Sequence, residues 1–172
     1  DNESLIFNSV YSIFSDGSNN IWLGSYGGVE LVKNNKFTHI RRDILNKNSL
    51  SHSNIIYFYQ DRAENIWIGT DGGVLNKWDK ENDAYIHYTF DPNNPKSIGG
   101  NAVTDLVEDK NGNLWISTWG GGLNFFDKTK GEFIRYQHQS GDPKSLVNNN
   151  LFAIDIDKRG VLWISTAIGL DS

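Results

Sequence analysis

The segment DKNGNLWISTWGGGL, residues 109–123, combines an acidic turn, two tryptophans and three consecutive glycines. Its main elements recur along the chain, because an aspartate precedes a tryptophan by six positions four times. The four pairs are Asp16 and Trp22, Asp61 and Trp67, Asp109 and Trp115, and Asp157 and Trp163. The tryptophans are 45, 48 and 48 residues apart, a period typical of propeller blades made of four strands. The segment is therefore one copy of a repeat.

Two further features keep the same period. A serine followed by leucine or isoleucine recurs four times, and an aromatic residue lies in the later part of three units. These are Ser4-Leu5, Ser49-Leu50, Ser97-Ile98 and Ser145-Leu146, and Phe37, Tyr85 and Phe133. The repeat units thus cover about residues 8–53, 54–101, 102–149 and 150–172 of one partial propeller, 1–172.

Each unit predicts up to four antiparallel strands. In the third unit these are 103–107, then 114–118 with large apolar groups on both faces, as in a strand buried on both sides, then 123–126 and a strand around Phe133. Third and fourth strands are complete in three units only, so we expect fourteen strands. The prediction is an all-β fold, a β-propeller fragment of about three and a half blades of four-stranded antiparallel sheets. A parallel β-helix is the structural alternative, although its rungs are usually shorter.

Composition excludes several classes of protein. With 16 basic and 21 acidic residues and a formal charge of −5, the chain lacks the basic face that nucleic acid requires. No run of about 18 uncharged apolar residues is present to span a membrane. The absence of cysteine excludes disulfides and thiolate metal sites. Residues 1–3 do not resemble the start of a signal peptide, so we expect a cytosolic protein or the mature or excised part of an exported one.

The aspartates and tryptophans of the repeat are expected to be structural. We predict that all four tryptophans pack in the core and that the aspartates cap turns, without a catalytic role. The turn at Asp109 offers oxygens from Asn111 and Asn113 but lacks the closing glutamate of a calcium loop. The histidines do not form a zinc ligand set, because they fall in different strands and connections. They are His39, His52, His87 and His138.

The repeat as a whole resembles that of the two-component-regulator propeller family. In the third unit the resemblance is carried by a series of residues that the other units largely repeat. They are Val103, Asp109, Gly112, Asn113, Leu114, Trp115, Ile116, Thr118, Gly121, Gly122, Leu123, Asp127, Gly131, Phe133, Tyr136, Pro143, Ser145 and Leu146. Asp-box hairpins of sialidases and the tryptophan-docking repeats of quinoprotein dehydrogenases fit less well, because of the six-residue spacing and the following glycine pair.

This resemblance implies a function as well as a fold. It implies a periplasmic sensor propeller of a membrane-anchored hybrid two-component histidine kinase of the Bacteroidetes type. Such a propeller recognises oligosaccharides or their breakdown products and signals to a kinase outside this chain. We therefore expect no enzymatic activity, cofactor, metal, nucleic-acid partner or direct membrane contact in these residues. The remaining blades of a propeller or a second copy of the chain are the expected protein partners, because three and a half blades expose apolar faces.

The position four residues after each core tryptophan varies within this constant frame. It holds Tyr26, Asp71, Trp119 and Ala167. In propellers the turns between second and third strands lie on the same face as the connections between blades, where ligands usually bind. We predict that Tyr26 and Trp119 stack against a sugar ring and that Asp71 accepts hydrogen bonds from its hydroxyls.

Three alternatives to a sugar site remain open. The variable residues could simply cap the apolar ends of the blades. The same face could instead serve a protein-interaction or propeller-propeller scaffold without a small-molecule site of its own. A hydrolase or lyase is the third class, and it would need convergent carboxylates and a histidine that the sequence does not assemble.

Overall fold

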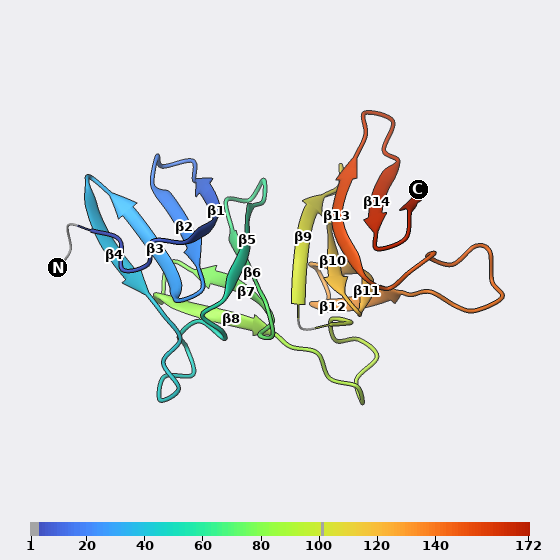
Figure 1. Cartoon of the computed structure of the whole chain (residues 1–172), viewed down its shortest axis with the longest axis horizontal. Coiled ribbons are helices and arrows are strands. Elements are labelled where there is room, and N and C mark those ends of the chain that lie inside the picture. The colour runs from blue at the N-terminus through green and yellow to red at the C-terminus, as the bar shows by residue number, and fades with distance from the viewer. Residues whose placement is uncertain (1–3, 101) are drawn as a thin grey trace. The chain divides into compact units, whose positions relative to one another are not determined.

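The computed structural model describes residues 4–100 and 102–172 (Figure 1). It divides into two compact units, Asp1–His87 and Tyr88–Ser172, and each is considered by itself. The described residues form fifteen strands and no helix. No helix able to cross a membrane is therefore found among them. Residues 1–3, which we compared with a signal peptide, lie outside the described residues.

The first unit holds two four-stranded antiparallel sheets, which we call blades 1 and 2. Each sheet follows chain order, so neighbouring strands are joined by hairpins. Blade 1 consists of β1 (Val10–Ser15), β2 (Ile21–Ser25), β3 (Gly28–Lys33) and β4 (Lys36–Ile40). Blade 2 consists of β5 (Ile55–Gln60), β6 (Ile66–Thr70), β7 (Leu75–Asp79) and β8 (Ala84–Tyr88), whose last residue belongs to the second unit.

The second unit holds blades 3 and 4. Blade 3 consists of β9 (Ala102–Glu108), β10 (Leu114–Trp119), β11 (Gly122–Asp127) and β12 (Glu132–Tyr136). Blade 4 has three strands, β13 (Leu151–Ile156), β14 (Leu162–Thr166) and β15 (Leu170–Asp171). The expected strands are present, but the expected number of fourteen is wrong, because Leu170 and Asp171 pair with Ser165 and Ile164 and begin a third strand.

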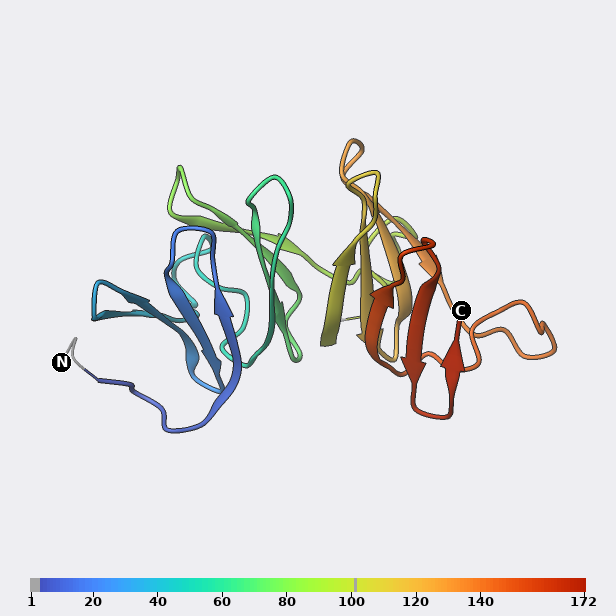
Figure 2. The same ribbon diagram turned by 90° about the horizontal axis from the view of Figure 1, so that it is seen from above.

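Within each unit two blades pack face to face. β1 lies beside β5 in the first unit and β9 beside β13 in the second (Figures 1 and 2). Trp22 belongs to a core cluster that includes Ile55 and Phe58 of the next blade. In the second unit Trp115 packs in the same way against a cluster formed mainly by blade 4. In each unit the tryptophan of the first blade therefore packs in the interface with the second blade.

All four tryptophans occupy the same register but are not equally buried. In the first-strand pairing they stand opposite Phe14, Tyr59, Val107 and Asp155. Trp22 and Trp67 are buried and Trp115 is half-buried, whereas Trp163 is 37% exposed. The prediction that all four lie in the core is thus wrong for Trp163. The physical reason is that blade 4 is the last sheet formed by the described residues, so no later blade is present there to cover the indole.

The six-residue spacing between aspartate and tryptophan has a direct structural cause. Asp16 Oδ1 accepts the backbone N–H groups of Ser18 and Asn20 at 2.9 and 3.0 Å, which closes the hairpin turn. Its Oδ2 accepts the indole N–H of Trp22 at 2.9 Å. Asp61 repeats this arrangement, with Trp67 at 3.0 Å. The aspartates are turn caps, as expected, and they also satisfy an indole that would otherwise be a buried unpaired donor.

These hydrogen bonds make the fold sensitive to acid. Burial raises the pKa of Asp16, but hydrogen bonds from Trp22 and Asn20 outweigh burial and hold the pKa below its ordinary value. The pKa of Asp109 is lowered in the same way, since bonds from Asn113 outweigh its burial. A carboxyl with a depressed folded pKa stabilises the fold above its unfolded pKa, and this contribution is lost as the pH falls through the folded pKa.

We therefore expect the free energy of unfolding to fall as the pH drops below about 4, the unfolded value for aspartate. Chemical denaturation between pH 7 and pH 2.5 measures this dependence. The control is the double variant Asp16→Asn and Asp109→Asn, which is expected to be less stable at pH 7 but to lose less on acidification. Equal acid dependence in the two proteins would contradict the assignment.

Candidate functional site

The turns between second and third strands contact the connections between blades. A Cβ built on Gly121, in the turn after β10, would lie 2.4 Å from the backbone of Gly99, in the connection between β8 and β9. A Cβ on Gly73 would lie 2.4 Å from His52, in the connection between β4 and β5. Only a residue without a side chain permits such close approach. The two sets of loops therefore share one face within each unit, as the sequence predicted.

Each first strand carries a β-bulge at its beginning. In β1, Val10 pairs with Ser25 and Ser12 with Gly24, which leaves Tyr11 as an extra residue outside the ladder. The same register shift occurs in the other three first strands. The extra residues are Tyr11, Ile56, Thr104 and Phe152. Bulges redirect a side chain and are frequent next to functional sites, so this second variable position belongs to the candidate site.

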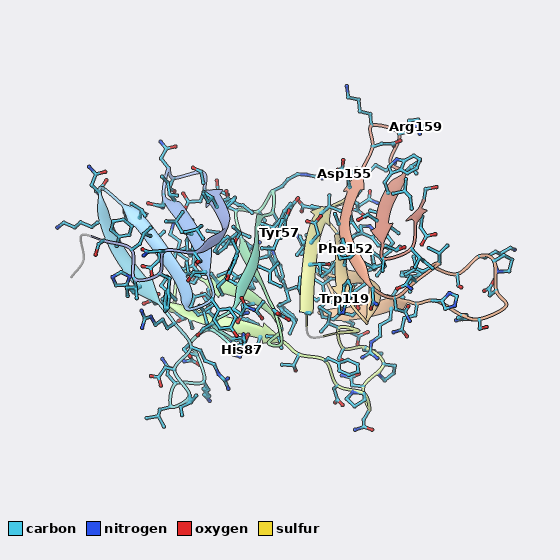
Figure 3. All side chains as sticks on the ribbon, viewed as in Figure 1. Tyr57, His87, Trp119, Phe152, Asp155 and Arg159 are labelled. Atoms are coloured by element: carbon cyan, nitrogen blue, oxygen red, sulfur yellow. The ribbon has the colours of Figure 1, made fainter. Side chains whose placement is uncertain are left out.

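In the second unit, Trp119 packs on the bulge residue of the following blade. Its ring lies 5.1 Å from that of Phe152 at an angle of 52° (Figure 3). Trp119 is 47% exposed and Phe152 is exposed to a similar extent. This pair offers solvent two aromatic surfaces that can stack against a flat or apolar ligand face.

The first unit repeats this arrangement with different residues. Tyr26, which is 69% exposed, lines an open depression of about 380 Å³. The other lining residues are Tyr11, Asn54, Ile55 and Ile56. The turn residue of blade 1 thus shares a surface with Ile56, the bulge residue of blade 2, just as Trp119 shares one with Phe152.

Asp71 joins the site of the first unit through Asn54. The side-chain amide of Asn54 donates to Asp71 Oδ2 at 3.1 Å, and the backbone N–H of Asp71 donates to the carbonyl of Asn54 at 3.0 Å. His52 Nδ1 accepts the backbone N–H of Asn54 at 3.1 Å, which makes Nδ1 the unprotonated ring nitrogen in this bond. Asp71 is exposed and keeps acceptor positions for a ligand.

The structure therefore groups two of the three predicted residues. Tyr26 and Asp71 lie around Asn54 in the first unit, and Trp119 forms an aromatic pair in the second. Sequence reasoning missed Tyr11, Asn54 and Phe152. A signal was present for the bulges, because Ile55-Ile56 and Leu151-Phe152 place apolar residues side by side where a strand would alternate.

The histidines lie in different parts of the fold and contact different partners. His39 contacts Glu30, His87 Nε2 lies 2.8 Å from the carbonyl oxygen of Ser49, and His138 Nδ1 lies 2.7 Å from that of Leu146. Within residues 4–100 and 102–172, no group of three or more histidines and carboxylates is placed to hold a metal ion.

A known protein family matches the chain in segments that recur with the period of the repeat. Residues 4–27, 49–72 and 97–120 match the family described as two component regulator propeller. Each match begins at the recurrent serine and runs through the core tryptophan into the turn that follows β2, β6 or β10. Three segments of the chain are thus similar to two component regulator propeller repeats. The family resemblance seen in the sequence is confirmed.

Solved structures support the same fold. The chain is similar to the extracellular domain of the hybrid two component system BT3049 from B. thetaiotaomicron, with a TM-score of 0.88 and 24% identity over 98% of this chain and 23% of that one. A hybrid system from the same organism, BT4673, gives a TM-score of 0.76 and 26% identity over 96% of this chain and 21% of that one. The chain thus spans less than a quarter of the length of these two relatives.

A more distant likeness extends to an enzyme. Virginiamycin B lyase from Staphylococcus aureus gives a TM-score of 0.68 and 14% identity over 99% of this chain and 57% of the lyase. At this identity the likeness shows the fold alone.

No curated protein matches the sequence. Together the structures confirm the predicted fold class, a partial β-propeller of about three and a half blades.

Proposed function

We propose that this chain is a ligand-sensing propeller segment of a membrane-anchored hybrid two-component sensor, located in the periplasm. Its ligand is an oligosaccharide or an oligosaccharide breakdown product, and the signal passes to a histidine kinase outside these residues. The regulator propeller repeats support this proposal. So does the similarity to extracellular domains of hybrid two component systems, which favours an extracytoplasmic location.

One observation carries the proposal, namely the repeated pairing of a variable turn residue with the bulge residue of the next blade. In one pair, exposed Trp119 packs against exposed Phe152. In the other, exposed Tyr26 shares a depression with half-buried Ile56. Sugars combine apolar ring faces with hydroxyl groups, so an aromatic surface next to a carboxylate and an amide suits them. Asp71 and Asn54 supply those polar groups in the first unit. This arrangement binds and orients a ligand without requiring chemistry on it.

The proposal predicts that Trp119→Ala weakens ligand binding by about tenfold or more while leaving the melting temperature within a few degrees of the parent. Stability is expected to change little because half of the indole is already in solvent. A thermal-shift screen of the chain against an oligosaccharide panel identifies a ligand, and titration calorimetry then compares the variants. Ile134→Ala, in the outer strand β12 and equally exposed, is the matched control and should bind as the parent does.

A protein-interaction module is the second candidate, and one observation favours it. Ile44 and Leu45, in the connection between β4 and β5, are almost fully exposed neighbouring apolar side chains, as in many protein contacts. Two results together would favour this candidate over the sensor proposal: the parent binds no oligosaccharide, and it binds a partner protein whose affinity falls with Ile44→Asp.

The Trp119 variant also tests the site assignment. If Trp119→Ala lowers stability as much as Trp115→Ala does, Trp119 belongs to the core and not to a binding surface.

A further inference from the structure

The connection between β4 and β5 carries two exposed apolar side chains at its tip. Ile44 is 82% exposed and Leu45 is 92% exposed, more than any other large apolar side chain that the structure describes. Figure 1 shows this connection as a loop that extends away from the strands of blades 1 and 2. The two side chains therefore take no part in the packing of the blades.

The turn in this loop forms equally well without apolar residues. Three connections between blades share the turn, in which the hydroxyl of the recurrent serine accepts the backbone N–H of the residue six positions earlier at 2.8 Å. The serines are Ser49, Ser97 and Ser145. At the positions of Ile44 and Leu45, the other two connections have Pro92-Asn93 and Ser140-Gly141. The fold of the turn thus does not require the apolar pair.

The same loop is basic, although the chain as a whole has a formal charge of −5. Residues 41–48 are all exposed and contain three basic residues and one acidic residue, Asp43, so their net charge is +2. The basic residues are Arg41, Arg42 and Lys47. The equivalent residues 89–96 and 137–144 each contain one lysine and one aspartate, so their net charge is zero with histidine neutral. Only the connection before β5 therefore combines an apolar tip with an excess of positive charge.

Backbone groups at the tip are hydrogen-bonded within the loop. The N–H of Leu45 donates to Asp43 Oδ1 at 2.9 Å, and the N–H of Asn46 donates to the Asp43 carbonyl at 3.1 Å. The N–H of Asn48 donates to Asn46 Oδ1 at 3.0 Å, and the N–H of Ser49 donates to the Asn46 carbonyl at 3.0 Å. Unpaired backbone groups are costly in an apolar medium, so a turn closed in this way is suited to enter one.

We infer that this loop binds the surface of an anionic lipid bilayer. Ile44 and Leu45 enter the boundary between headgroups and acyl chains, and Arg42 and Lys47 contact the negative headgroups. A stable protein interface buries about 800 Å² on each partner, far more than two apolar side chains offer, whereas a bilayer requires no matching surface. This contact goes beyond the proposed function and departs from the expectation, implied by the family resemblance, that these residues do not touch a membrane.

Sedimentation of the chain with lipid vesicles tests the charge requirement. Vesicles of phosphatidylcholine and phosphatidylglycerol, mixed about two to one, are expected to bind the chain about tenfold more strongly than vesicles of phosphatidylcholine alone. High salt should remove this preference, because it screens the attraction between exposed charges. The double variant Arg42→Gln and Lys47→Gln should bind the mixed vesicles about tenfold more weakly than the parent, since both cations attract the headgroups.

A second double variant tests the apolar tip. Ile44→Pro with Leu45→Asn copies the connection between β8 and β9, so it should keep the melting temperature of the parent and lose most of the binding to mixed vesicles. Ile168→Asn is the matched control. Ile168 is 70% exposed in the turn after β14, and residues 163–172 contain no lysine or arginine, so this variant should bind as the parent does.

A fluorescent label locates the contact on the chain. Because the chain has no cysteine, Leu45→Cys carries a single environment-sensitive dye at the tip of the loop. Its emission should shift to shorter wavelength with mixed vesicles, as the dye enters a less polar environment. The same dye on Asn93→Cys, the equivalent position in the connection between β8 and β9, should show no shift.

Three results would each overturn the inference: no binding of the parent to mixed vesicles, equal binding of the parent and the Ile44→Pro, Leu45→Asn variant, or equal shifts at the two labelled positions. If vesicle binding is absent and a partner protein binds through Ile44, the occupant of the loop is a protein instead. A failure of sugar binding would leave these results unaffected, because residues 41–48 do not line the proposed ligand site.

Discussion

Replacement of Trp22 by alanine is expected to lower the free energy of unfolding of the first unit by about 3–5 kcal/mol. The indole is fully buried and fills the interface between blades 1 and 2, where it contacts Phe58 and Trp78. Its removal leaves a cavity that a close-packed interface cannot collapse to fill. Urea denaturation followed by near-ultraviolet circular dichroism measures the loss.

Trp163→Ala is the matched control for this prediction. It removes the same side chain from the same register position, but Trp163 is partly in solvent and no sheet covers it among the described residues of its unit. The expected loss is about 1–2 kcal/mol. Equal losses for the two variants would show that the interface between blades contributes less than the packing within a blade.

Asp61→Ala is expected to destabilise the first unit by about 3–5 kcal/mol without removing any apolar surface. Asp61 is buried, and its carboxylate accepts the backbone N–H groups of Ala63 and Asn65 and the indole N–H of Trp67. The alanine leaves these donors unpaired in a site from which water is largely excluded, and each unpaired donor costs about 1–3 kcal/mol.

The equivalent substitution in blade 4, Asp157→Ala, is the control. Asp157 is partly exposed, and its bond to the Trp163 indole is longer, at 3.4 Å. Water can replace the lost acceptor there, so the effect is expected to be much smaller. Urea denaturation of both variants measures the difference, and equal losses would mean that the cap at Asp61 acts only through the turn.

The fold could be predicted because the same sequence pattern occurs four times, once in each repeat unit. Each copy places an acid six residues before a tryptophan, and the structure shows that this spacing closes one turn and pairs one indole. The burial of Trp163 could not be predicted from its own repeat. Burial in this fold depends on the next blade, and a residue's own sequence neighbourhood does not say whether that blade is there.

The candidate site was predicted only in part for a related reason. Tyr26, Asp71 and Trp119 stood out because they vary within a constant turn. Their partners Tyr11 and Phe152 lie one residue into a strand, where an aromatic side chain is ordinary. Only the pairing register shows that these residues stand outside the ladder. Asn54 was missed because its role depends on a backbone hydrogen bond between two loops, the β4–β5 connection that holds Asn54 and the turn after β6 that holds Asp71.

The bulges have a consequence for how such a protein diversifies. At Tyr11, Ile56 and Phe152 the side chain is redirected by backbone geometry, and the ladder hydrogen bonds on either side are made by other residues. Exchange of these side chains, together with those at positions 26, 71 and 119, alters the surface while the blade frame keeps its hydrogen bonds. A combinatorial library confined to these six codons would therefore vary the proposed ligand-binding surface while leaving the packing of the blades largely unchanged.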